Sequence, residues 1–169
     1  MVYNPIQGSL ISMETFNTQH EKWLDDPVNE GLPPSFNFTA DMIWSALSDE
    51  MVAGLKFCNG MDAMGDYVPV ICAVNQPGKV LTSYNEFEPI PNEEAEAFQS
   101  IWVSEKGEEV LRSFYLGRVS LFQYLRESRG SQLTASFMLN SDNQSTGAII
   151  VEGRSEVLNF SLPCPPACD

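Results

Sequence analysis

The stretch LTASFMLNSDNQSTGAIIVEGRSEVLNFSL, residues 133–162, holds three strand-like runs in succession. These runs, rich in apolar and β-branched residues, are Leu133 to Leu139, Gly147 to Val151 and Val157 to Leu162. The links between them contain Ser-Asp-Asn and Gly-Arg-Ser, which are residue types that favour tight turns. The pattern predicts an antiparallel meander at the end of the chain.

The clearest helical pattern begins at Thr39, a residue type preferred at the N-cap, and Asp41 complements the helix dipole. Apolar residues then recur every four positions along one predicted helix face: Ile43, Leu47, Met51 and Leu55. The Asn-Gly pair at residues 59 and 60 supplies a stop signal. We expect one long helix that packs against a sheet.

Three further segments lie between these two patterns. Residues 68–74 and 79–84 are mostly apolar runs separated by a turn signal, and they predict a hairpin. Residues 93–102 predict a short helix that starts at Asn92, with an apolar stripe made of Ala95, Phe98 and Trp102. Residues 120–128 predict another helix.

Other segments are less distinctive. Residues 105–116 fit either a helix or a hairpin that turns at Lys106-Gly107, and we favour the helix. The N-terminal runs VYNPIQ and SLISMETF predict one or two short edge strands. The run DDPVNEGLPPS, residues 25–35, predicts a loop because its three prolines disfavour helix in the residues before them.

Strands near both ends with helices between them predict an α+β fold rather than regular βαβ alternation. We expect mainly an antiparallel sheet with about three to four helices packed on it. The 169 residues suit a single domain over residues 1–169, and no repeat or Gly-Ser linker divides the chain. The Pro-rich end, residues 163–169, is predicted to be a tail.

Charge is the outlying feature of the composition. The chain has 23 acidic and 9 basic residues, a net charge of −14, where a small domain stays soluble with a magnitude of about 2 to 8. Residues 1–55 hold eight acids and one Lys, and residues 86–109 hold eight Glu and one Lys. Residues 110–169 balance five acids with all five Arg. The acidic excess therefore lies in two blocks, whereas adaptation to a saline habitat would spread it along the chain.

An acidic field repels phosphate backbones and anionic lipids, so direct binding to nucleic acid or to a membrane is not expected. The same field attracts a basic protein partner. The predicted partner-binding residues belong to the second block: Glu86, Glu88, Glu93, Glu94, Glu96, Glu105, Glu108, Glu109 and the aromatic Trp102. Phe87 and Phe98 are interleaved with these residues, and aromatic anchors within a charged rim are typical of interfaces. The alternative interpretation is that the aromatic residues belong to the core.

We therefore predict a small acidic protein-binding module, an inhibitor, an immunity or antitoxin-type factor or an accessory subunit, that docks a basic partner surface. In the most extreme version of this hypothesis, the acidic surface mimics the charge of a nucleic acid. The alternative hypothesis is an enzyme that uses carboxylates without a recognisable motif. A concave apolar pocket that holds two or more acids would distinguish that hypothesis.

Familiar catalytic and cofactor motifs are missing from the sequence. It contains no G-x-S-x-G or G-x-G-x-x-G, and Gly78-Lys79 lacks the rest of a P-loop. His20, the only histidine, has polar neighbours and is interpreted as a solvated surface residue. We expect no catalytic residue and no cofactor, and we favour a function other than catalysis.

Of the four cysteines, Cys72 lies in an apolar run and is predicted to be a core residue. Pro-Pro-Ala stands between Cys164 and Cys168, where pairs of zinc ligands prefer turn-forming residues, so no metal site is expected and the role of both residues stays open. No apolar run reaches the length of a membrane span, and the N-terminus lacks the features of a signal peptide. A cytoplasmic location is expected, and the oligomeric state stays open.

Overall fold

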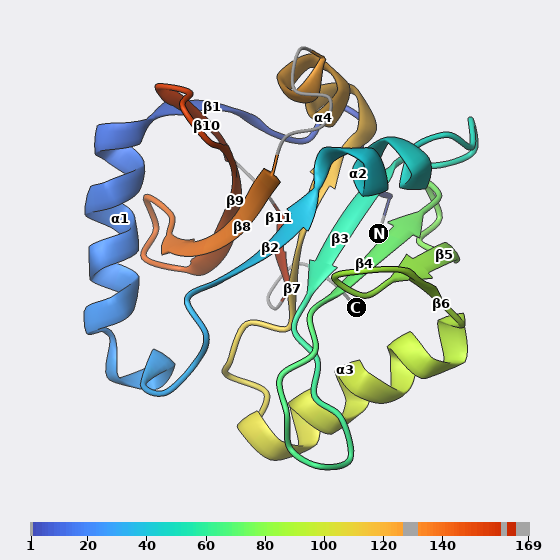
Figure 1. Cartoon of the computed structure of the whole chain (residues 1–169). Helices are drawn as coiled ribbons and strands as arrows, with labels where there is room; N and C mark the ends of the chain where they lie inside the picture. Colours follow the sequence, from blue (N-terminus) through green and yellow to red (C-terminus); the bar gives the residue numbers. More distant parts are fainter. Residues whose placement is uncertain (1, 127–131, 160–161, 165–169) are drawn as a thin grey trace.

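Two antiparallel sheets form the frame of the computed structural model, which describes residues 2–126, 132–159 and 162–164 (Figure 1). Helices lie against the outer faces and at one end of this pair of sheets. The prediction of an α+β fold with an antiparallel sheet and three to four helices is confirmed, with four α-helices in the described residues. The chain builds two sheets where the sequence suggested mainly one.

The first sheet has the strand order β1-β10-β9-β8-β2. Its centre is the predicted meander, formed by β8 (Gln132–Leu139), β9 (Ser145–Val151) and β10 (Glu156–Asn159). Two short strands, β1 (Ser9–Ser12) and β2 (Ser35–Thr39), pair at the edges. Within the described residues, the third predicted run therefore stays in this sheet only up to Asn159.

The second sheet has the strand order β11-β7-β3-β4-β5-β6. The predicted hairpin is confirmed as β4 (Val70–Val74) and β5 (Val80–Tyr84). The other strands of this sheet are β3 (Gly54–Cys58), β6 (Pro89–Ile90), β7 (Ser113–Gly117) and β11 (Leu162–Cys164). Pro163 and Cys164, predicted to begin a tail, instead pair with β7. Residues 165–169 of the predicted tail lie outside the described residues.

The two sheets meet in an aromatic core. Phe57 of β3 stacks on Phe114 of β7 with ring centroids 5.1 Å apart, and Phe114 meets Phe137 of β8 edge-on at 6.1 Å. Because side chains alternate across a strand, the outer face of each sheet also carries apolar residues. These outer faces are covered by α1 (Met13–Asp25) on the first sheet and by α3 (Asn92–Lys106) on the second. The layer order is therefore α1, first sheet, second sheet, α3.

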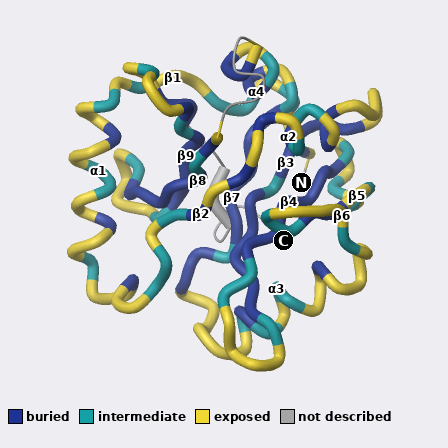
Figure 2. Tube along the Cα trace, in the orientation of Figure 1, coloured by how far each residue is buried: buried dark blue, intermediate teal, exposed yellow. Residues whose placement is uncertain are grey.

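Burial follows these layers in Figure 2, where the central strands are dark and the outward sides of α1 and α3 are exposed. Two shorter helices, α2 (Ala40–Ala46) and α4 (Arg118–Leu125), close the end of the molecule that is opposite α3 (Figure 1). None of the helices in the described residues is long and apolar enough to cross a membrane.

The helix predicted from Thr39 begins where expected, since the Thr39 side chain accepts a hydrogen bond from the Met42 N–H. It ends at Ala46, however, because Asp49 organises a turn by accepting the Met51 N–H at 2.8 Å. Met51 is 68% exposed, and Leu55 is a fully buried residue of β3. The prediction of one long helix was wrong. Leu55 lies four residues after Met51 and so fits the spacing of a helix face, but it belongs to a strand.

One further prediction was only partly correct, and another was wrong. The edge strand predicted within SLISMETF is confirmed for Ser9–Ser12, which form β1, but its last four residues instead begin α1, in which only Phe16 and Trp23 of 13 residues are buried. In residues 105–116, Gly107 ends α3 with a φ of +88°, which favours glycine, and the chain then enters β7. The helix predicted over 120–128 is present as α4, which begins earlier at Arg118.

Candidate functional site

The acidic residues predicted to bind a partner lie on α3 and on the chain segments beside it. Seven of the eight glutamates are exposed and Glu86 is half-buried. Across the described residues, none of these eight side chains makes a hydrogen bond or an ion pair with the rest of the protein. Their charges are therefore available to another molecule.

The structure divides the eight glutamates into two groups. Glu86, Glu88, Glu93, Glu94 and Glu96 lie at or before the start of α3, and Glu105, Glu108 and Glu109 lie at its end. Glu93 and Glu105 are 12 residues apart on this helix, about 18 Å at 1.5 Å per residue. One block in the sequence thus becomes two acidic groups at the two ends of one helix.

The turn that precedes α3 presents an apolar side chain among the glutamates. The Asn85 Oδ1 accepts the N–H groups of Phe87 at 2.8 Å and Glu88 at 2.9 Å, and the Asn85 N–H donates to the Glu88 carbonyl at 3.0 Å. Three hydrogen bonds therefore fix this turn. The Phe87 side chain is 86% exposed, between Glu86 and Glu88. An ordered turn thus holds a phenyl ring in solvent at an acidic surface.

Trp102, predicted as an aromatic anchor for a partner, is instead a core residue. It is 1% exposed and packs with Met61 and Val110 beneath α3. The spacing of Ala95, Phe98 and Trp102 turns all three toward the protein, as the predicted apolar stripe requires. The prediction for Trp102 was therefore wrong, and Phe87 is the aromatic residue that this surface exposes.

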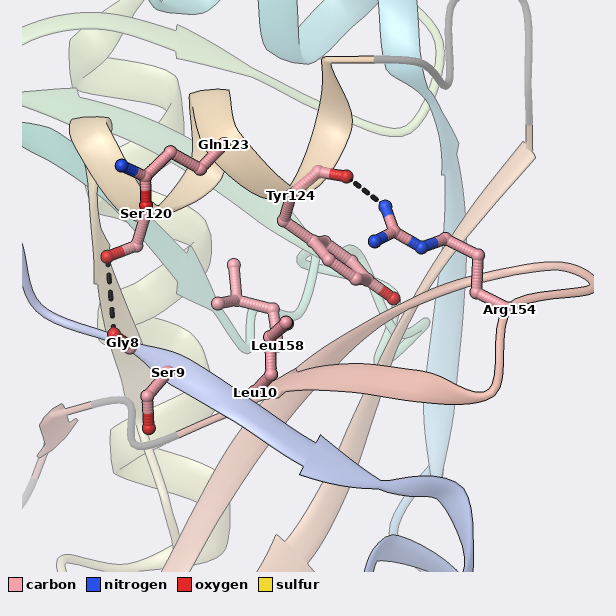
Figure 3. Close-up of a pocket in the computed structure, with 8 residues that line it drawn as sticks. All are labelled: Gly8, Ser9, Leu10, Ser120, Gln123, Tyr124, Arg154 and Leu158. Carbon is pink, nitrogen blue, oxygen red and sulfur yellow. Dashed lines mark hydrogen bonds between the residues drawn. The ribbon is translucent and has the colours of Figure 1, made fainter.

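At α4, a charged side chain contacts the rest of the protein instead of facing solvent. The Arg154 guanidinium lies 4.3 Å from the centre of the Tyr124 ring and donates a hydrogen bond to the Tyr124 carbonyl (Figure 3). The Tyr124 hydroxyl donates to the Glu156 carbonyl at 3.0 Å and accepts the Val151 N–H at 3.1 Å. Burial raises the pKa of this phenol above its usual value. The arginine and the tyrosine thus hold α4 against the first sheet.

Figure 3 also shows the small pocket beside these residues, with a volume of about 110 Å³. The Ser120 hydroxyl at its edge donates to the carbonyls of Ile6 and Gly8, at 3.0 and 3.3 Å. Leu10 and Leu158 contribute apolar surface. None of the described residues that line this pocket carries a carboxylate, so the pocket does not meet the criterion of two or more acids in an apolar cavity.

Several acids do line another pocket, at the end of α1. Asp25, Asp26, Glu30 and Trp23 contribute to this broad open hollow of about 500 Å³. The Asp26 Oδ1 accepts the Val28 N–H at 3.1 Å, which caps the 3₁₀ helix η1 (Pro27–Asn29). Asp25 and Glu30 are exposed. These acids therefore face water or maintain the backbone, rather than meeting in a dry apolar site.

His20 differs from its predicted role as a solvated surface residue. Its Nδ1 lies 2.5 Å from the Phe137 carbonyl oxygen, and its ring stacks near Phe16 and Trp23 at 5.4 and 6.5 Å. The half-buried ring fastens α1 to β8. The described residues contain no group of three or more His, Cys, Asp or Glu that could hold a metal ion.

Cys72 is a core residue, as predicted, and is 2% exposed beneath α3. Its Sγ lies 3.7 Å from the Ser83 hydroxyl and accepts a hydrogen bond from Gln99 at 3.7 Å. A hydrogen bond with Cys58 is the largest influence that lowers the pKa of the Cys72 thiol, and burial opposes it. The thiol is shielded from solutes while α3 is in place. Nothing is described for Cys168, and only the backbone of Cys164 is placed, in β11.

Comparisons with protein-family models, with curated proteins and with solved structures find no match to this chain. Function must therefore be inferred from the residues themselves. The signal that sequence reasoning missed at the α3 surface is the turn at Asn85, since an Asn side chain readily hydrogen-bonds the backbone two residues further along the chain.

Proposed function

We propose that this protein is an acidic protein-binding module that docks a basic partner at the start of α3. The exposed Phe87 ring between Glu86 and Glu88 carries the proposal. A phenyl ring in water costs free energy that burial in an interface regains, since apolar burial is worth about 25 cal/mol per Å². A hydrogen-bonded turn also reduces the entropy lost on binding.

The charges around Phe87 indicate the chemistry of the partner. Glu88, Glu93, Glu94 and Glu96 are exposed near this turn and have no internal partner among the described residues. A rim of unpaired carboxylates favours a surface rich in Lys and Arg, and it accelerates encounter at low salt. The partner is therefore expected to offer an apolar recess within a basic surface. An inhibitor, an immunity or antitoxin-type factor and an accessory subunit all fit this mode of binding.

The proposal is tested by affinity capture from the native host with a charge-reversal variant. The variant Glu93→Lys, Glu94→Lys, Glu96→Lys should lose the basic protein that wild type retains at low salt and releases at high salt. The matched control reverses three exposed acids elsewhere, Glu14, Glu21 and Glu30, and so changes net charge equally. This control should still capture the protein.

Phe87→Ser separates specific docking from general electrostatic attraction. It leaves the charge unchanged and should weaken capture about tenfold or more, as expected for an aromatic anchor. The proposal would be contradicted if Phe87→Ser and the triple charge-reversal variant both captured the protein as well as wild type does. Competition by DNA or RNA for the captured protein would identify its nucleic-acid site as the docking surface.

A further inference from the structure

A third pocket lies far from α3 in the layer order, where α1 meets the first sheet. Its volume is about 300 Å³, within the range of small-molecule sites. The pocket is lined by residues of α1, of the first sheet and of the turn between β8 and β9: Gln7, Ile11, Thr15, Gln19, Met138, Leu139, Asn140, Ser141, Asp142, Thr146 and Asn159. Four amides and three hydroxyls stand here beside one carboxylate, and none of the described residues in the lining is Lys, Arg or His.

Asn159 is a buried polar residue of this lining, together with Gln19, whose Oε1 is buried without a hydrogen-bond partner among the described residues. The Asn159 side chain is 4% exposed, and its Nδ2 donates to the Gly147 carbonyl at 3.1 Å and lies 3.1 Å from the Met138 sulfur. These are its side-chain hydrogen bonds with the described residues, and Oδ1 takes part in neither of them. Because Nδ2 is anchored to a carbonyl, the amide orientation is fixed and Oδ1 is left as an acceptor.

The rim of the pocket is held in place by its own turn. The Asn140 Oδ1 accepts the N–H groups of Asp142 and Gln144, both at 2.9 Å, and Asn143 adopts a left-handed φ of 59°. These bonds fix the backbone and leave the exposed Asp142 carboxylate free of them. A ligand that reaches the rim therefore meets a carboxylate on an ordered backbone.

We infer that this pocket binds a small uncharged polyol, such as a monosaccharide or a sugar alcohol. Hydroxyl groups can donate to the Asn159 Oδ1 and, as a vicinal pair, to the two oxygens of Asp142. The C–H surface of the ligand packs on Ile11, Met138 and Leu139. An anion is disfavoured because the described residues of the lining include a carboxylate and no cation, in a protein of net charge −14.

The test uses the methionine methyl groups as reporters in ¹³C NMR. Met138 lines the pocket, whereas Met64 is 88% exposed on a loop of the second sheet and serves as the internal control. Titration with glucose and with sorbitol should shift the Met138 methyl signal saturably and leave the Met64 signal in place. Met138→Leu assigns the signal with little change in volume.

Asp142→Asn keeps the turn and removes the charge, and it should weaken polyol binding about tenfold, the value of one charge-assisted hydrogen-bond pair. Glu152→Gln, an equal loss of charge at an exposed site on the next turn, should bind as wild type does. Glucose 6-phosphate should bind more weakly than glucose.

Three outcomes would overturn the inference. A Met138 signal that does not move saturably up to about 100 mM glucose or sorbitol would show that neither polyol binds, even weakly. Tighter binding of glucose 6-phosphate or of the cationic glucosamine would show that the pocket selects charge. Equal polyol affinity in wild type and Asp142→Asn would show that the Asp142 carboxylate does not contact the ligand.

Discussion

The α3 end and the α4 end of the molecule use charge in opposite ways. At α4, Arg154 lies on the Tyr124 ring and Arg118 donates to the Asp49 carbonyl at 3.1 Å while its guanidinium lies 5.1 Å from the Phe122 ring. At α3, the eight glutamates have no such contact among the described residues. Arg118 and Arg154 thus hold parts of the fold together, whereas the side chains of the eight glutamates make no hydrogen bond with the described residues.

This difference separates stability from recognition. A charge that is held by carbonyls and rings contributes to folding, whereas an exposed charge contributes little to it. The aromatic residues follow the same division, since Tyr124 is 3% exposed and Phe87 is 86% exposed. Substitutions at α4 should therefore act on stability, and substitutions at α3 should act on binding.

The largest expected effect is that of Tyr124→Ala. Loss of a buried aromatic side chain and of its two hydrogen bonds should lower the free energy of unfolding by about 3–5 kcal/mol. Phe87→Ala, the matched loss of an exposed ring, should change it by less than about 0.5 kcal/mol. Urea denaturation measures the free energy of unfolding of both variants. A similar decrease in the two variants would contradict the assignment of stability to the α4 end and of binding to the α3 end.

High pH should destabilise the fold through its buried phenols. Burial raises the pKa of Tyr67, Tyr115 and Tyr124 above the value of about 10 for the unfolded chain. The stability from these neutral phenols is complete below pH 10 and falls as pH rises toward the folded-state pKa, by about 1.4 kcal/mol per pH unit for each phenol. Absorbance at 295 nm should show these phenols ionising only as the circular dichroism signal of the fold is lost. Their ionisation in folded protein near pH 10 would contradict the prediction.

Arg154→Gln should have an intermediate effect. It removes a hydrogen bond to the Tyr124 carbonyl and a cation–π contact, and the free energy of unfolding should fall by about 1–2 kcal/mol. Arg126→Gln is the control, because Arg126 is exposed at the end of the same helix. Thermal unfolding measures both variants, and equal melting temperatures would show that Arg154 is not a structural contact.

The smallest expected effect on stability is that of replacing Glu93, Glu94 and Glu96 with Gln. These side chains are exposed, and the loss of their favourable position at the helix start is offset by relief of mutual repulsion. The free energy of unfolding should stay within about 0.5 kcal/mol of wild type in urea denaturation. A larger loss would mean that the acidic surface maintains the fold.

The comparison also shows where sequence reasoning succeeds. The meander from β8 to β10 and the β4–β5 hairpin were predictable, because apolar runs bounded by turn residues report local structure directly. The N-cap at Thr39 and the start of α3 at Asn92 follow from the same local signals. The acidic block at 86–109 was also visible, although its division along α3 was not.

By itself, the sequence determined the α+β class, the antiparallel pairing of consecutive strands and the uneven distribution of charge. Only the tertiary structure decided that β7 is a strand, that Leu55 belongs to a sheet and that Trp102 is buried while Phe87 is exposed. The physical reason is that turns and caps depend on neighbouring residues in the chain. Burial depends instead on which distant segment covers a side chain, and for these residues that segment lies elsewhere in the sequence.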